Sequence, residues 1–518
     1  TAYEIYQCDW SSDVCSSDLW KYIMSQITIR KKNEVYLKLE SEPHVHRELS
    51  DYFSFEMPEA KFLKRNPRYR YWDGVIHLYS PGTGELYSGL LNHLKEWCEE
   101  RKYSLSYETD KWYGEVEEIN GMVSPAGVKI FMDKISKYPP RDYQYATVYK
   151  ALKNNRGLFL SPTGSGKSLM IYSIVRYYVA TGKKILLVVP TTSLVEQMIK
   201  DFKDYGWNAE EHCHTIYSGK DKNTDKSVII STWQSIYKFP KRYFDDIDCV
   251  IGDEAHLFKS KSLTGIMTKL HNAKYRFGFT GTLDGSKTHK WVLEGLFGAC
   301  EKVTKTDDLI KKGHLSNFRI KILVCKHEYQ YFEDYHSEIE YLVNNRKRNN
   351  LIKNLVRDLE GNTLVLFNYV EKHGEPLYEL INNDIGEDRK VFFVHGSIDV
   401  ENREEVRVIT EQENDAVIIA SYGTFSTGIN IKRLHNIVFA SPSKSRIRNL
   451  QSIGRGLRKG SEKDKAVLYD IADDMRCKNY INHTLKHFVE RSKIYTEEKF
   501  PFKIYKIQLK HGRSSKNT

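Results

Sequence analysis

Residues 158–168 read Leu-Phe-Leu-Ser-Pro-Thr-Gly-Ser-Gly-Lys-Ser, an apolar run that leads into a turn with two glycines. Gly164 and Gly166 allow backbone conformations that point several N–H groups at one anion. Lys167 and Ser168 then open the sequence LMIYSIVRYYVA, which predicts a helix whose N-terminus adds a positive dipole end. The stretch therefore predicts a phosphate-binding loop between a buried strand and a helix.

The loop also carries the side chains that a nucleotide with Mg²⁺ requires. Lys167 can reach the β- and γ-phosphates, and the Ser168 hydroxyl can bind Mg²⁺. The pattern G-x-x-x-x-G-K-[ST] is complete except at its first position, where Ser161 replaces glycine. The alternative is an ordinary glycine turn before a helix, but the predicted strand, turn and helix lie where the motif needs them.

The composition is that of a globular protein with several domains. The chain has 518 residues, of which 40% are hydrophobic and 28% charged. A chain of this length is expected to form about three or four domains. The net charge of +11 favours polyanionic partners. No stretch predicts a membrane span or a signal peptide, and the eight cysteines form no C-x-x-C pair. We therefore expect a cytoplasmic protein with reduced cysteines and no membrane partner.

Two series of apolar runs predict the architecture. KILLVVP at 184–190 and CVIGDE at 249–254 belong to a first series of strands that alternate with helical stretches. TLVLFN at 363–368 belongs to a second series, which follows a connector near Asp307. Such alternation is typical of parallel sheets buried between helices. The predicted fold class is α/β, with two similar parallel-sheet lobes and a cleft between them.

Ahead of the lobes, shorter and mixed patterns predict a small α+β domain. Residues 27–40 predict a β-hairpin, residues 45–56 a helix, and residues 69–80 a strand pair around an Asp-Gly turn. The first residues contain the near-repeat SSDVCSSDL, which resembles a translated sequencing adapter, so they are interpreted as a foreign leader. The expected divisions are a leader at 1–23, an N-terminal domain at 24–115, a first lobe at 116–306, a second lobe at 307–480 and a basic extension at 481–518.

Two further motifs carry catalytic side chains. VIGDEAH places Asp253 at the end of an apolar strand, where a carboxylate can hold Mg²⁺ beside the phosphates. Glu254 can orient and deprotonate the attacking water. QSIGRGLRKG places Arg455 and Arg458 on one face of a helix, from which they can meet the γ-phosphate across the cleft. The alternatives are an acidic turn after a strand and a solvated basic helix turn.

In this order the motifs resemble those of the superfamily 2 helicases, over about residues 139–457. PPRDYQ resembles the adenine-reading motif, SPTGSGKS motif I, DEAH motif II, FTGT motif III, YGTFSTGINI motif V and QSIGRGLR motif VI. The segments RNPRYRYWDGVIHLY, YGTFSTGI and QSIGRGLRK resemble the UvsW-type helicases of T4-like phages most closely. The resemblance implies two RecA-like lobes, the cofactors ATP and Mg²⁺, and DNA as the partner.

The same resemblance implies residue roles. It supports catalysis by the residues already singled out, Lys167, Asp253, Glu254, Arg455 and Arg458, with Mg²⁺ held by Ser168 and Asp253. The nucleotide is expected to contact Arg141, Gln144, Thr163, Gly164, Ser165, Gly166, Lys167, Ser168 and Gly428. Coupling of hydrolysis to movement is expected from His256, Thr280, Thr282 and Gln451.

DNA contacts are expected in two places. Residues at the predicted strand ends of both lobes can face a phosphate backbone, with helix capping as their alternative role. They are Pro190, Thr191, Thr192, Thr232, Trp233, Gln234, His395, Gly396, Ser421 and Thr424. In the N-terminal domain, Lys61, Arg65, Arg68 and Arg70 interleave with aromatic residues that include Trp72, which suits phosphate contacts beside base stacking. The alternative is that these aromatic residues form the core of the domain.

The predicted function is that of an ATP-dependent DNA helicase or translocase in phage replication, recombination and repair. The resemblance implies remodelling of branched DNA by a monomer in the host-cell cytoplasm, through fork regression, Holliday-junction branch migration and unwinding of RNA–DNA hybrids in R-loops. Two alternatives share the motifs: the translocating subunit of a restriction system, and a DNA-binding module that ATP only switches. The N-terminal region has no PD-(D/E)xK-like cluster, and intact Lys167, Glu254 and Arg458 favour an active ATPase.

Overall fold

The computed structural model describes residues 26–57, 60, 64, 66–67, 70–108, 123–217, 221–424, 431, 433–441, 443, 445–456, 465–476 and 479–509. Within these ranges the side chains of residues 400, 404, 446–448, 455 and 456 are not described. The expected leader at 1–23 lies outside the described residues.

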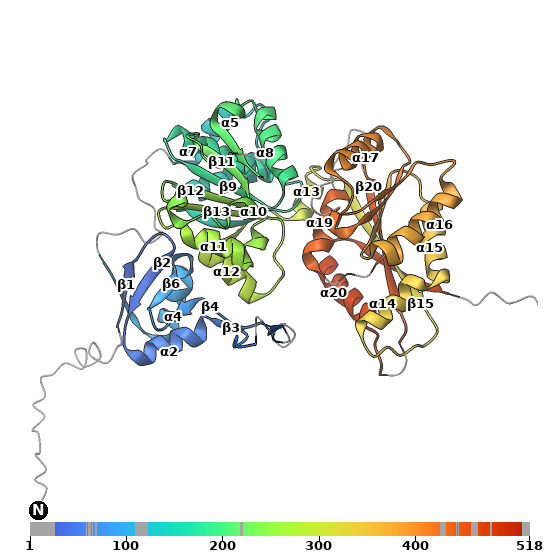
Figure 1. Ribbon diagram of the computed structural model, residues 1–518, viewed down its shortest axis with the longest axis horizontal. Coiled ribbons are helices and arrows are strands. Elements are labelled where there is room, and N and C mark those ends of the chain that lie inside the picture. Colours follow the sequence, from blue (N-terminus) through green and yellow to red (C-terminus); the bar gives the residue numbers. More distant parts are fainter. Residues whose placement is uncertain are drawn as a thin grey trace, which may run out of the picture.

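A small mixed sheet forms the N-terminal part of the protein (Figure 1). Its elements are β1 (Gln26–Lys31), β2 (Tyr36–Glu40), α2 (Pro43–Tyr52), β5 (Tyr79–Ser80), β6 (Glu85–Tyr87), η2 (Ser88–Leu90), α4 (Leu91–Arg101) and β7 (Ser104–Tyr107). The strand order is β5-β6-β2-β1-β7, and the antiparallel pair β1–β2 confirms the predicted hairpin. Alternation along β1 and β2 directs Ile27, Ile29, Leu37 and Leu39 into the core.

The described residues between Ser54 and His77 form an arm that leaves this sheet. β3 (Ser54–Glu56) pairs with β4 (Val75–His77) as a separate two-stranded sheet, and Figure 1 shows it projecting toward the second lobe. The predicted turn is present, since Gly74 has φ +88°. The prediction of a strand directly before this turn is wrong. β4 pairs instead with β3, and the Met57 amide donates to the Gly74 carbonyl at 2.9 Å where the arm begins.

In the described residues, the first lobe is a seven-stranded parallel sheet of order β10-β11-β9-β12-β13-β8-β14. Its strands are β8 (Arg156–Leu160), β9 (Ile185–Val189), β10 (Cys213–Ile216), β11 (Val228–Thr232), β12 (Cys249–Asp253), β13 (Tyr275–Thr280) and β14 (Cys300–Lys302). Its helices are α5 (Pro125–Ile135), α6 (Asp142–Asn154), α7 (Lys167–Ala180), α8 (Thr192–Asp204), α9 (Ala209–His212), α10 (Trp233–Ile236), η3 (Lys241–Phe244), η4 (Ala255–Lys259), α11 (Lys261–Lys269) and α12 (Lys287–Phe297). β9, β11 and β12 are buried along their whole length, as expected for strands covered on both faces.

The second lobe repeats this design, with a described parallel sheet of order β17-β18-β16-β19-β20-β15-β21. Its strands are β15 (Asn317–Lys326), β16 (Thr363–Phe367), β17 (Val391–Val394), β18 (Val417–Ser421), β19 (Asn436–Phe439), β20 (Lys465–Asp474) and β21 (Phe502–Gln508). Its helices are α13 (Thr306–Lys311), α14 (Tyr335–Asn344), α15 (Arg346–Arg357), η5 (Val370–Gly374), α16 (Glu375–Ile385), α17 (Val400–Gln412), α19 (Arg446–Gly456) and α20 (His483–Glu497). The two sheets and the small N-terminal domain confirm the predicted α/β class.

Two strands of the second lobe lie where the sequence predicted none. The connector near Asp307 contains β15, which pairs with β20 on one side and β21 on the other. The range 481–518, expected as a basic extension, contains α20 and β21. Basic residues interrupt both strands, and the exposed Arg319 of β15 alternates with buried Phe318 and Ile320. The resulting pattern differs from the continuous apolar runs of the other strands.

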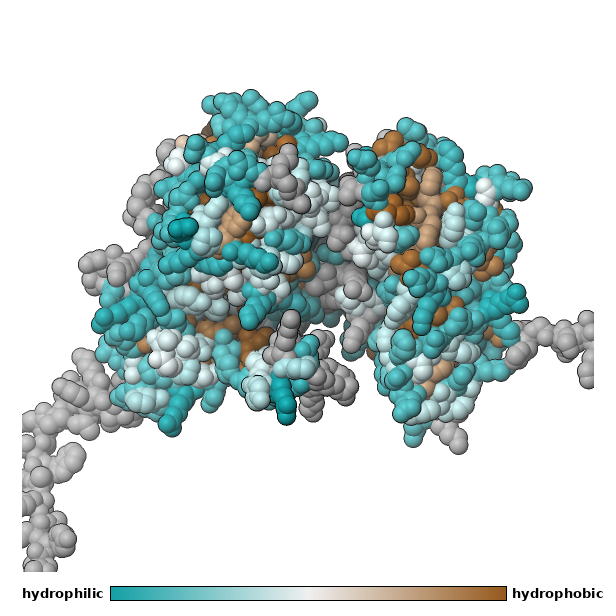
Figure 2. Space-filling view, viewed as in Figure 1, coloured by the Kyte–Doolittle hydropathy of each residue, from teal (hydrophilic) through white to brown (hydrophobic). Residues whose placement is uncertain are grey.

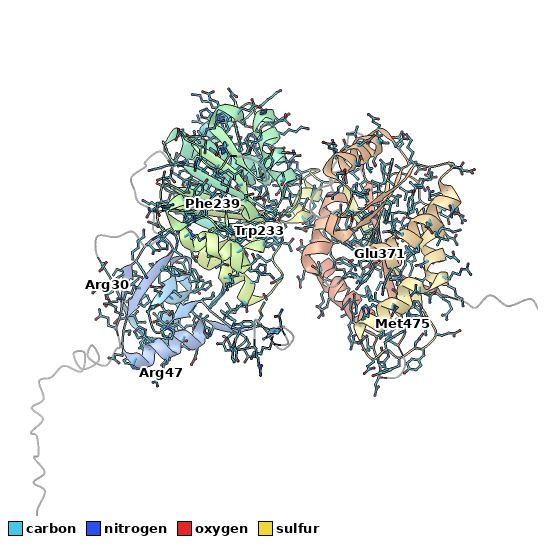
Figure 3. The ribbon with its side chains drawn as sticks, viewed as in Figure 1. Arg30, Arg47, Trp233, Phe239, Glu371 and Met475 are labelled. Carbon is cyan, nitrogen blue, oxygen red and sulfur yellow. The ribbon has the colours of Figure 1, made fainter. Side chains whose placement is uncertain are left out.

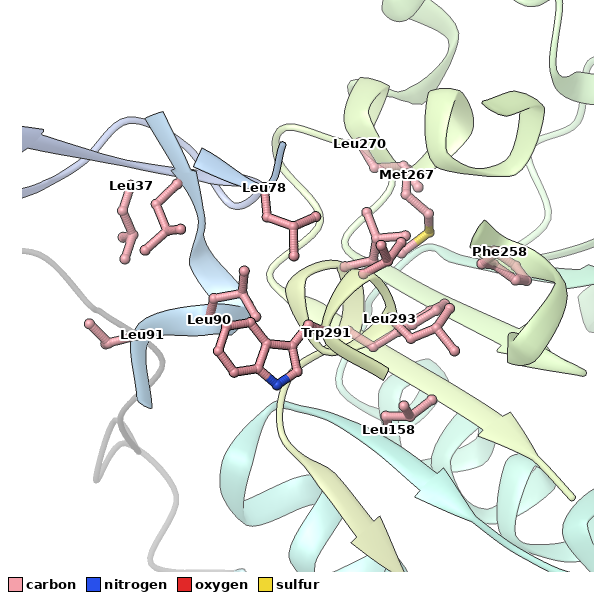
Figure 4. Close-up of a cluster of buried hydrophobic side chains, with 14 of the residues drawn as sticks. Leu37, Leu78, Leu90, Leu91, Leu158, Phe258, Met267, Leu270, Trp291 and Leu293 are labelled. Carbon is pink, nitrogen blue, oxygen red and sulfur yellow. The ribbon is translucent and has the colours of Figure 1, made fainter. Parts of the chain in front are cut away.

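The N-terminal domain and the first lobe share one hydrophobic core (Figure 4). Trp291 of α12 stacks on His93, with ring centroids 4.3 Å apart. Phe53 and Phe55 contact the same indole, with centroids at 5.7 and 5.2 Å. Because aromatic pairs of this kind add to the free energy of simple burial, they hold the domain firmly against α12.

Polar contacts surround this shared core. Arg156, buried at the start of β8, donates to Ser88 Oγ at 2.8 Å and to the Glu34 carbonyl at 3.2 Å. His93 Nε2 lies 2.9 Å from Glu294 Oε2 on α12. The N-terminal domain is therefore fixed to the first lobe by side chains from both.

Hydrophilic residues cover most of the face seen in Figure 2, which is hollowed between the lower parts of the two lobes, with the arm beside the hollow. Over the described residues, no helix has the length and apolar character to cross a bilayer.

Gly89 provides a test of the domain contact. A Cβ at this position would lie 2.0 Å from the Glu294 carbonyl oxygen, so Gly89→Ala must push η2 away from α12. We expect a loss of about 1–3 kcal/mol in the free energy of unfolding, as for other overpacked contacts, measured by urea denaturation. Gly82→Ala is the matched control, because no heavy atom lies within 4 Å of its added Cβ. Equal free energies of unfolding for the two variants would contradict the close packing of η2 against α12.

Candidate nucleotide site and DNA interface

The phosphate-binding loop follows β8 and runs directly into α7. Gly164 and Gly166 adopt φ values of +81° and +78°, a region that favours glycine. Neighbours also leave no room for a side chain. A Cβ on Gly166 would lie 2.3 Å from Gln144 Nε2, and one on Gly164 would lie 2.6 Å from Leu315 Cδ2. Conformation and packing therefore both require the two glycines of the motif.

Ser161, which replaces the first glycine of the motif, is built into the loop. Its side chain is fully buried, and its Oγ lies 2.5 Å from Ser165 Oγ. Its amide donates to the Thr280 carbonyl at 2.8 Å. Ser161 thus contacts Ser165 within the loop and Thr280 at the end of β13. The structure therefore accommodates a serine at the first glycine position of the motif.

Side chains at the start of α6 donate hydrogen bonds to the carbonyls of Gly164, Ser165 and Gly166 in this loop. Gln144 Nε2 and Tyr143 OH both donate to the Ser165 carbonyl at 2.9 Å. Arg141 Nη1 donates to the Gly164 carbonyl at 3.3 Å. The residues predicted to read adenine therefore lie against the loop predicted to bind phosphate.

Lys167 meets the acidic pair at the end of β12. Lys167 Nζ lies 3.1 Å from Glu254 Oε1. Burial alone would raise the pKa of Glu254, but Lys167 and His256 outweigh it and hold that pKa well below its usual range. Burial raises the pKa of Asp253 to about 6, with Glu254 adding to the shift and Lys167 opposing it. The two adjacent carboxyl groups are thus electrostatically distinct, as acid and base residues of active sites often are.

The residues predicted to hold Mg²⁺ fit that role. Asp253 Oδ1 is buried and accepts no hydrogen bond from any described residue. Such an oxygen suits a hard divalent cation, which takes oxygen ligands. Ser168 Oγ lies 2.7 Å from Tyr205 OH, so the second predicted ligand is held by a tyrosine.

The predicted coupling residues form a chain from motif II toward the second lobe. His256 Nδ1 lies 3.0 Å from Thr280 Oγ1 at the end of β13. Thr282 follows two residues later and lines a small cavity with Leu450 and Ile453 of α19. Contacts therefore run from the DEAH motif through motif III to the helix that carries motif VI.

The second lobe also contacts the loop directly. A Cβ on Gly454 of α19 would lie 2.5 Å from Thr163 Cβ, so the two backbones are in close approach. Gln451 is half-buried on the same helix. The side chain of Arg455, and Arg458 and Gly428 as a whole, lie outside the described residues.

The residues predicted to contact DNA in the lobes follow strands β9, β11, β17 and β18. Thr191 and Thr232 precede α8 and α10, and neither side chain makes a capping hydrogen bond. Gln234 Nε2 donates to the Pro190 carbonyl at 3.3 Å, which joins the loops after β9 and β11. Ser421 Oγ lies 2.8 Å from Thr424 Oγ1.

Burial decides which of these side chains a phosphate could reach. Thr232 and Thr424 are each 5% exposed, which leaves mainly their backbone groups for a partner. Thr192 and Gly396 are exposed, and Pro190, His395 and Trp233 are half-buried. Figure 3 shows Trp233 on the first lobe, close to the second lobe in this view.

The described residues of the arm are largely open to solvent. Tyr71 is 94% exposed, and Arg70 and Lys64 are also exposed. Trp72 is half-buried, and its Nε1 donates to the Val75 carbonyl at 3.1 Å. The arm therefore presents at least one aromatic ring outward, whereas Trp72 partly stabilises the arm itself. The predicted contacts Lys61, Arg65 and Arg68 lie outside the described residues.

Three residues at the site were not predicted from the sequence. Tyr143 stands inside PPRDYQ, so its position beside Gln144 could have indicated it. Tyr205 and Leu315 belong to no motif and reach the loop from distant parts of the chain. Only the folded structure brings these two to the site.

Comparisons with known proteins agree with this geometry. Residues 26–108 match the family described as "DNA helicase UvsW, N-terminal", residues 137–285 "Type III restriction enzyme, res subunit", and residues 346–460 "Helicase conserved C-terminal domain". The ATP-dependent DNA helicase uvsW of Enterobacteria phage T4 is 32% identical over 505 residues, which cover 92% of this chain and 98% of that protein. The chain belongs to the UvsW family of superfamily 2 helicases.

Solved structures resemble this UvsW-family chain as well. The crystal structure of T4 UvsW aligns with a TM-score of 0.49 and 31% identity, over 94% of this chain and 100% of that one. The DNA-bound Type ISP restriction-modification enzyme LlaBIII aligns with a TM-score of 0.54 and 15% identity, over 73% of this chain and 31% of that one. The second likeness shows a shared fold alone.

The contact between Tyr205 and Ser168 predicts a change in nucleotide affinity. Tyr205→Phe removes the hydroxyl that holds Ser168, so the serine is free to bind Mg²⁺. We expect the KM for Mg²⁺–ATP to fall about two- to tenfold, as for the loss of one competing hydrogen bond. The measurement is steady-state ATP hydrolysis. Tyr243→Phe is the control, because its hydroxyl donates to the Lys222 carbonyl and not to a residue of the loop. An unchanged or raised KM for Tyr205→Phe would show that the contact does not compete with Mg²⁺.

Proposed function

We propose that the chain uses Mg²⁺-dependent ATP hydrolysis to translocate on DNA and to remodel branched DNA. Membership of its family makes it an ATP-dependent DNA helicase. The proposal adds forks, Holliday junctions and RNA–DNA hybrids in R-loops as substrates, and action as a monomer in the cytoplasm of a phage-infected host cell. The observation that supports it best is the meeting of Gly454 with Thr163, which brings motif VI against the phosphate-binding loop.

In the first step, Lys167 exchanges partners. It pairs with Glu254 at 3.1 Å in this structure, and a phosphate group is the stronger partner for its ammonium. Once Lys167 turns to the phosphates, Glu254 loses the charge that keeps its pKa low. Its pKa then rises, and a carboxylate of higher pKa is a better acceptor for the proton of the attacking water.

Asp253 and Ser168 are the residues that would hold Mg²⁺. The ion, when bound, neutralises charge that develops on the phosphate oxygens. Asp253 must be ionised to bind it, and because its pKa is raised to about 6, binding displaces a proton mainly at pH values below about 6. Arg455 and Arg458 are proposed to complete the site from the second lobe as arginine fingers.

Movement on DNA would result from changes in the contact between the two lobes, which would both bind the same ATP molecule. The acidic pair is connected with α19 through His256, Thr280 and Thr282. A rearrangement at the γ-phosphate would therefore shift the second lobe. The strand ends of both lobes would hold the phosphate backbone without reading its sequence. Alternate opening and closing of the lobes then advances the strand.

The arm supports a preference for branched DNA. The two lobes can hold one strand, but that contact does not distinguish a junction from a plain single strand. The arm projects from a domain fixed to the first lobe, and its Tyr71 and Arg70 are open to solvent. An exposed ring beside basic groups suits stacking on bases at a branch with phosphate contacts on either side.

The translocating subunit of a restriction system remains the second candidate. The match of residues 137–285 to a restriction-enzyme subunit lies within the first lobe, which both classes share. The match of residues 26–108 to the UvsW N-terminal domain favours the branched-DNA helicase.

Unwinding of a synthetic four-way junction tests the proposal. We expect ATP-dependent unwinding by the full chain, and no detectable ATP hydrolysis or unwinding by Lys167→Ala. Junction binding by this variant should persist in gel-shift titrations, because Lys167 contacts phosphate of the nucleotide and not DNA. An active ATPase that leaves junctions intact would contradict the branched-DNA function, and hydrolysis by Lys167→Ala would remove this loop from the mechanism.

The basic residues of the arm predict a salt dependence. Replacing Arg65, Arg68 and Arg70 by glutamine should remove up to three phosphate contacts. The slope of log affinity against log salt on duplex DNA should then flatten by about 2 to 3, with little change in ATPase on single-stranded DNA.

The matched control replaces three lysines in and after α5 by glutamine: Lys129, Lys134 and Lys137. This helix lies at the side of the first lobe opposite to the arm (Figure 1). This control changes the net charge by the same amount, so its slope should stay close to that of the parent. Equal flattening by both variants would assign the effect to net charge, and an equal loss of ATPase and unwinding in the arm variant would make the arm a folding element.

A further inference from the structure

One end of α12 is tied to the DEAH motif. His289 is buried, and its Nε2 lies 2.8 Å from the His256 carbonyl oxygen. Its Nδ1 lies 2.9 Å from Asp284 Oδ2. Lys259 Nζ, at the end of the turn that follows Glu254, lies 2.9 Å from the same Asp284 oxygen. Two polar contacts therefore join the turn of the acidic pair to the first turn of α12.

The same helix enters the N-terminal domain. Trp291, two residues after His289, belongs to the hydrophobic core that the first lobe shares with that domain (Figure 4). The ring centroids of Tyr52 and Phe55 lie 5.3 and 5.2 Å from the indole, and Lys287 Nζ lies 4.2 Å from its centroid on the helix itself. These contacts leave little freedom for α12 to move without the domain.

The contact with Phe55 leads directly into the arm. Phe55 is the middle residue of β3 and pairs with Ile76 of β4. These two strands form the base of the arm, and the segment between them carries Arg70 and Tyr71. A continuous series of contacts thus runs from Glu254 through His256, His289 and Trp291 to the base of the arm.

We propose that α12 couples the ATP site to the arm, with His289 as the positioning residue at the ATP-site end and Trp291 as the contact at the domain end. This inference rests on the proposed function of the arm. Nucleotide binding rearranges Glu254 and Lys167, and the His256 carbonyl moves with that turn. Because His289 is bonded to this carbonyl and α12 is a rigid helix, the displacement reaches Trp291 and then the base of the arm.

Such coupling is reciprocal for binding affinities. If ATP repositions the arm, a nonhydrolysable ATP analogue must change the affinity for a four-way junction. A plain single strand does not need the arm, so its affinity should change less. We expect the analogue to change junction affinity about fivefold more than single-strand affinity in the full chain.

The test measures both affinities by fluorescence anisotropy, with and without the analogue and Mg²⁺. His289→Phe keeps a buried ring but no hydrogen bond, and Phe55→Leu loosens the base of the arm. Each variant should remove the excess, which is the additional change that the analogue causes in junction affinity relative to single-strand affinity. The double variant should show no larger loss of this excess than either single variant. His289→Gln retains a donor for the His256 carbonyl and should keep part of the excess.

His373→Phe is the matched control, since His373 is a fully buried histidine of the second lobe bonded to Ser441 Oγ. It should retain the whole excess. A purely structural role for His289 would lower both affinities together and leave their ratio unchanged, which would overturn the proposal. An absence of any excess in the parent, or its persistence in His289→Phe and Phe55→Leu, would also overturn it. If the unmodified protein did not bind DNA or unwind junctions, that result would contradict the proposed function and not the coupling through α12.

Discussion

Close packing around residues 161–168 is the constraint on which the rest of the structure depends. Gln144 from α6, Leu315 from the connector and Gly454 from α19 all press on this one loop. The loop can keep its anion-binding shape only because Gly164 and Gly166 have no side chains. The same packing means that the loop cannot change without affecting both lobes, so nucleotide binding and lobe movement share one physical cause.

The sequence predicts the two sheets well because most of their strands are covered on both faces. β9, β11 and β12 must be apolar along their whole length, and such runs are easily recognised. β15 and β21 were missed because exposed basic residues interrupt them. The arm was misassigned for a different reason. β3 has three residues, and its partner β4 lies far along the chain, so no local pattern indicates the pairing.

The positions of the residues proposed for catalysis are predictable to the extent that chemistry fixes residue type and spacing. Lys167, Asp253 and Glu254 come together as expected, since each belongs to a motif whose spacing follows from the fold. Tyr205 and His289 have no such signal. Each reaches the site through a hydrogen bond to a residue that is distant in sequence, and only tertiary structure creates that contact. The roles of Lys167, Asp253 and Glu254 stay predictions, as do those of Arg455, Arg458 and Gly428.

The position of β15 between β20 and β21 has a consequence for the order in which the protein can form. β15 is the first strand of the second lobe to leave the ribosome, and its two neighbours are the last. During synthesis both edges of this long, partly apolar strand stay unpaired until more than a hundred further residues, from β16 to β19, have been made. Unpaired edges of this kind attract other chains. A chain that stops before Phe502 would have the longer, more apolar β15 as its edge strand in place of the exposed β21, and such an edge favours aggregation.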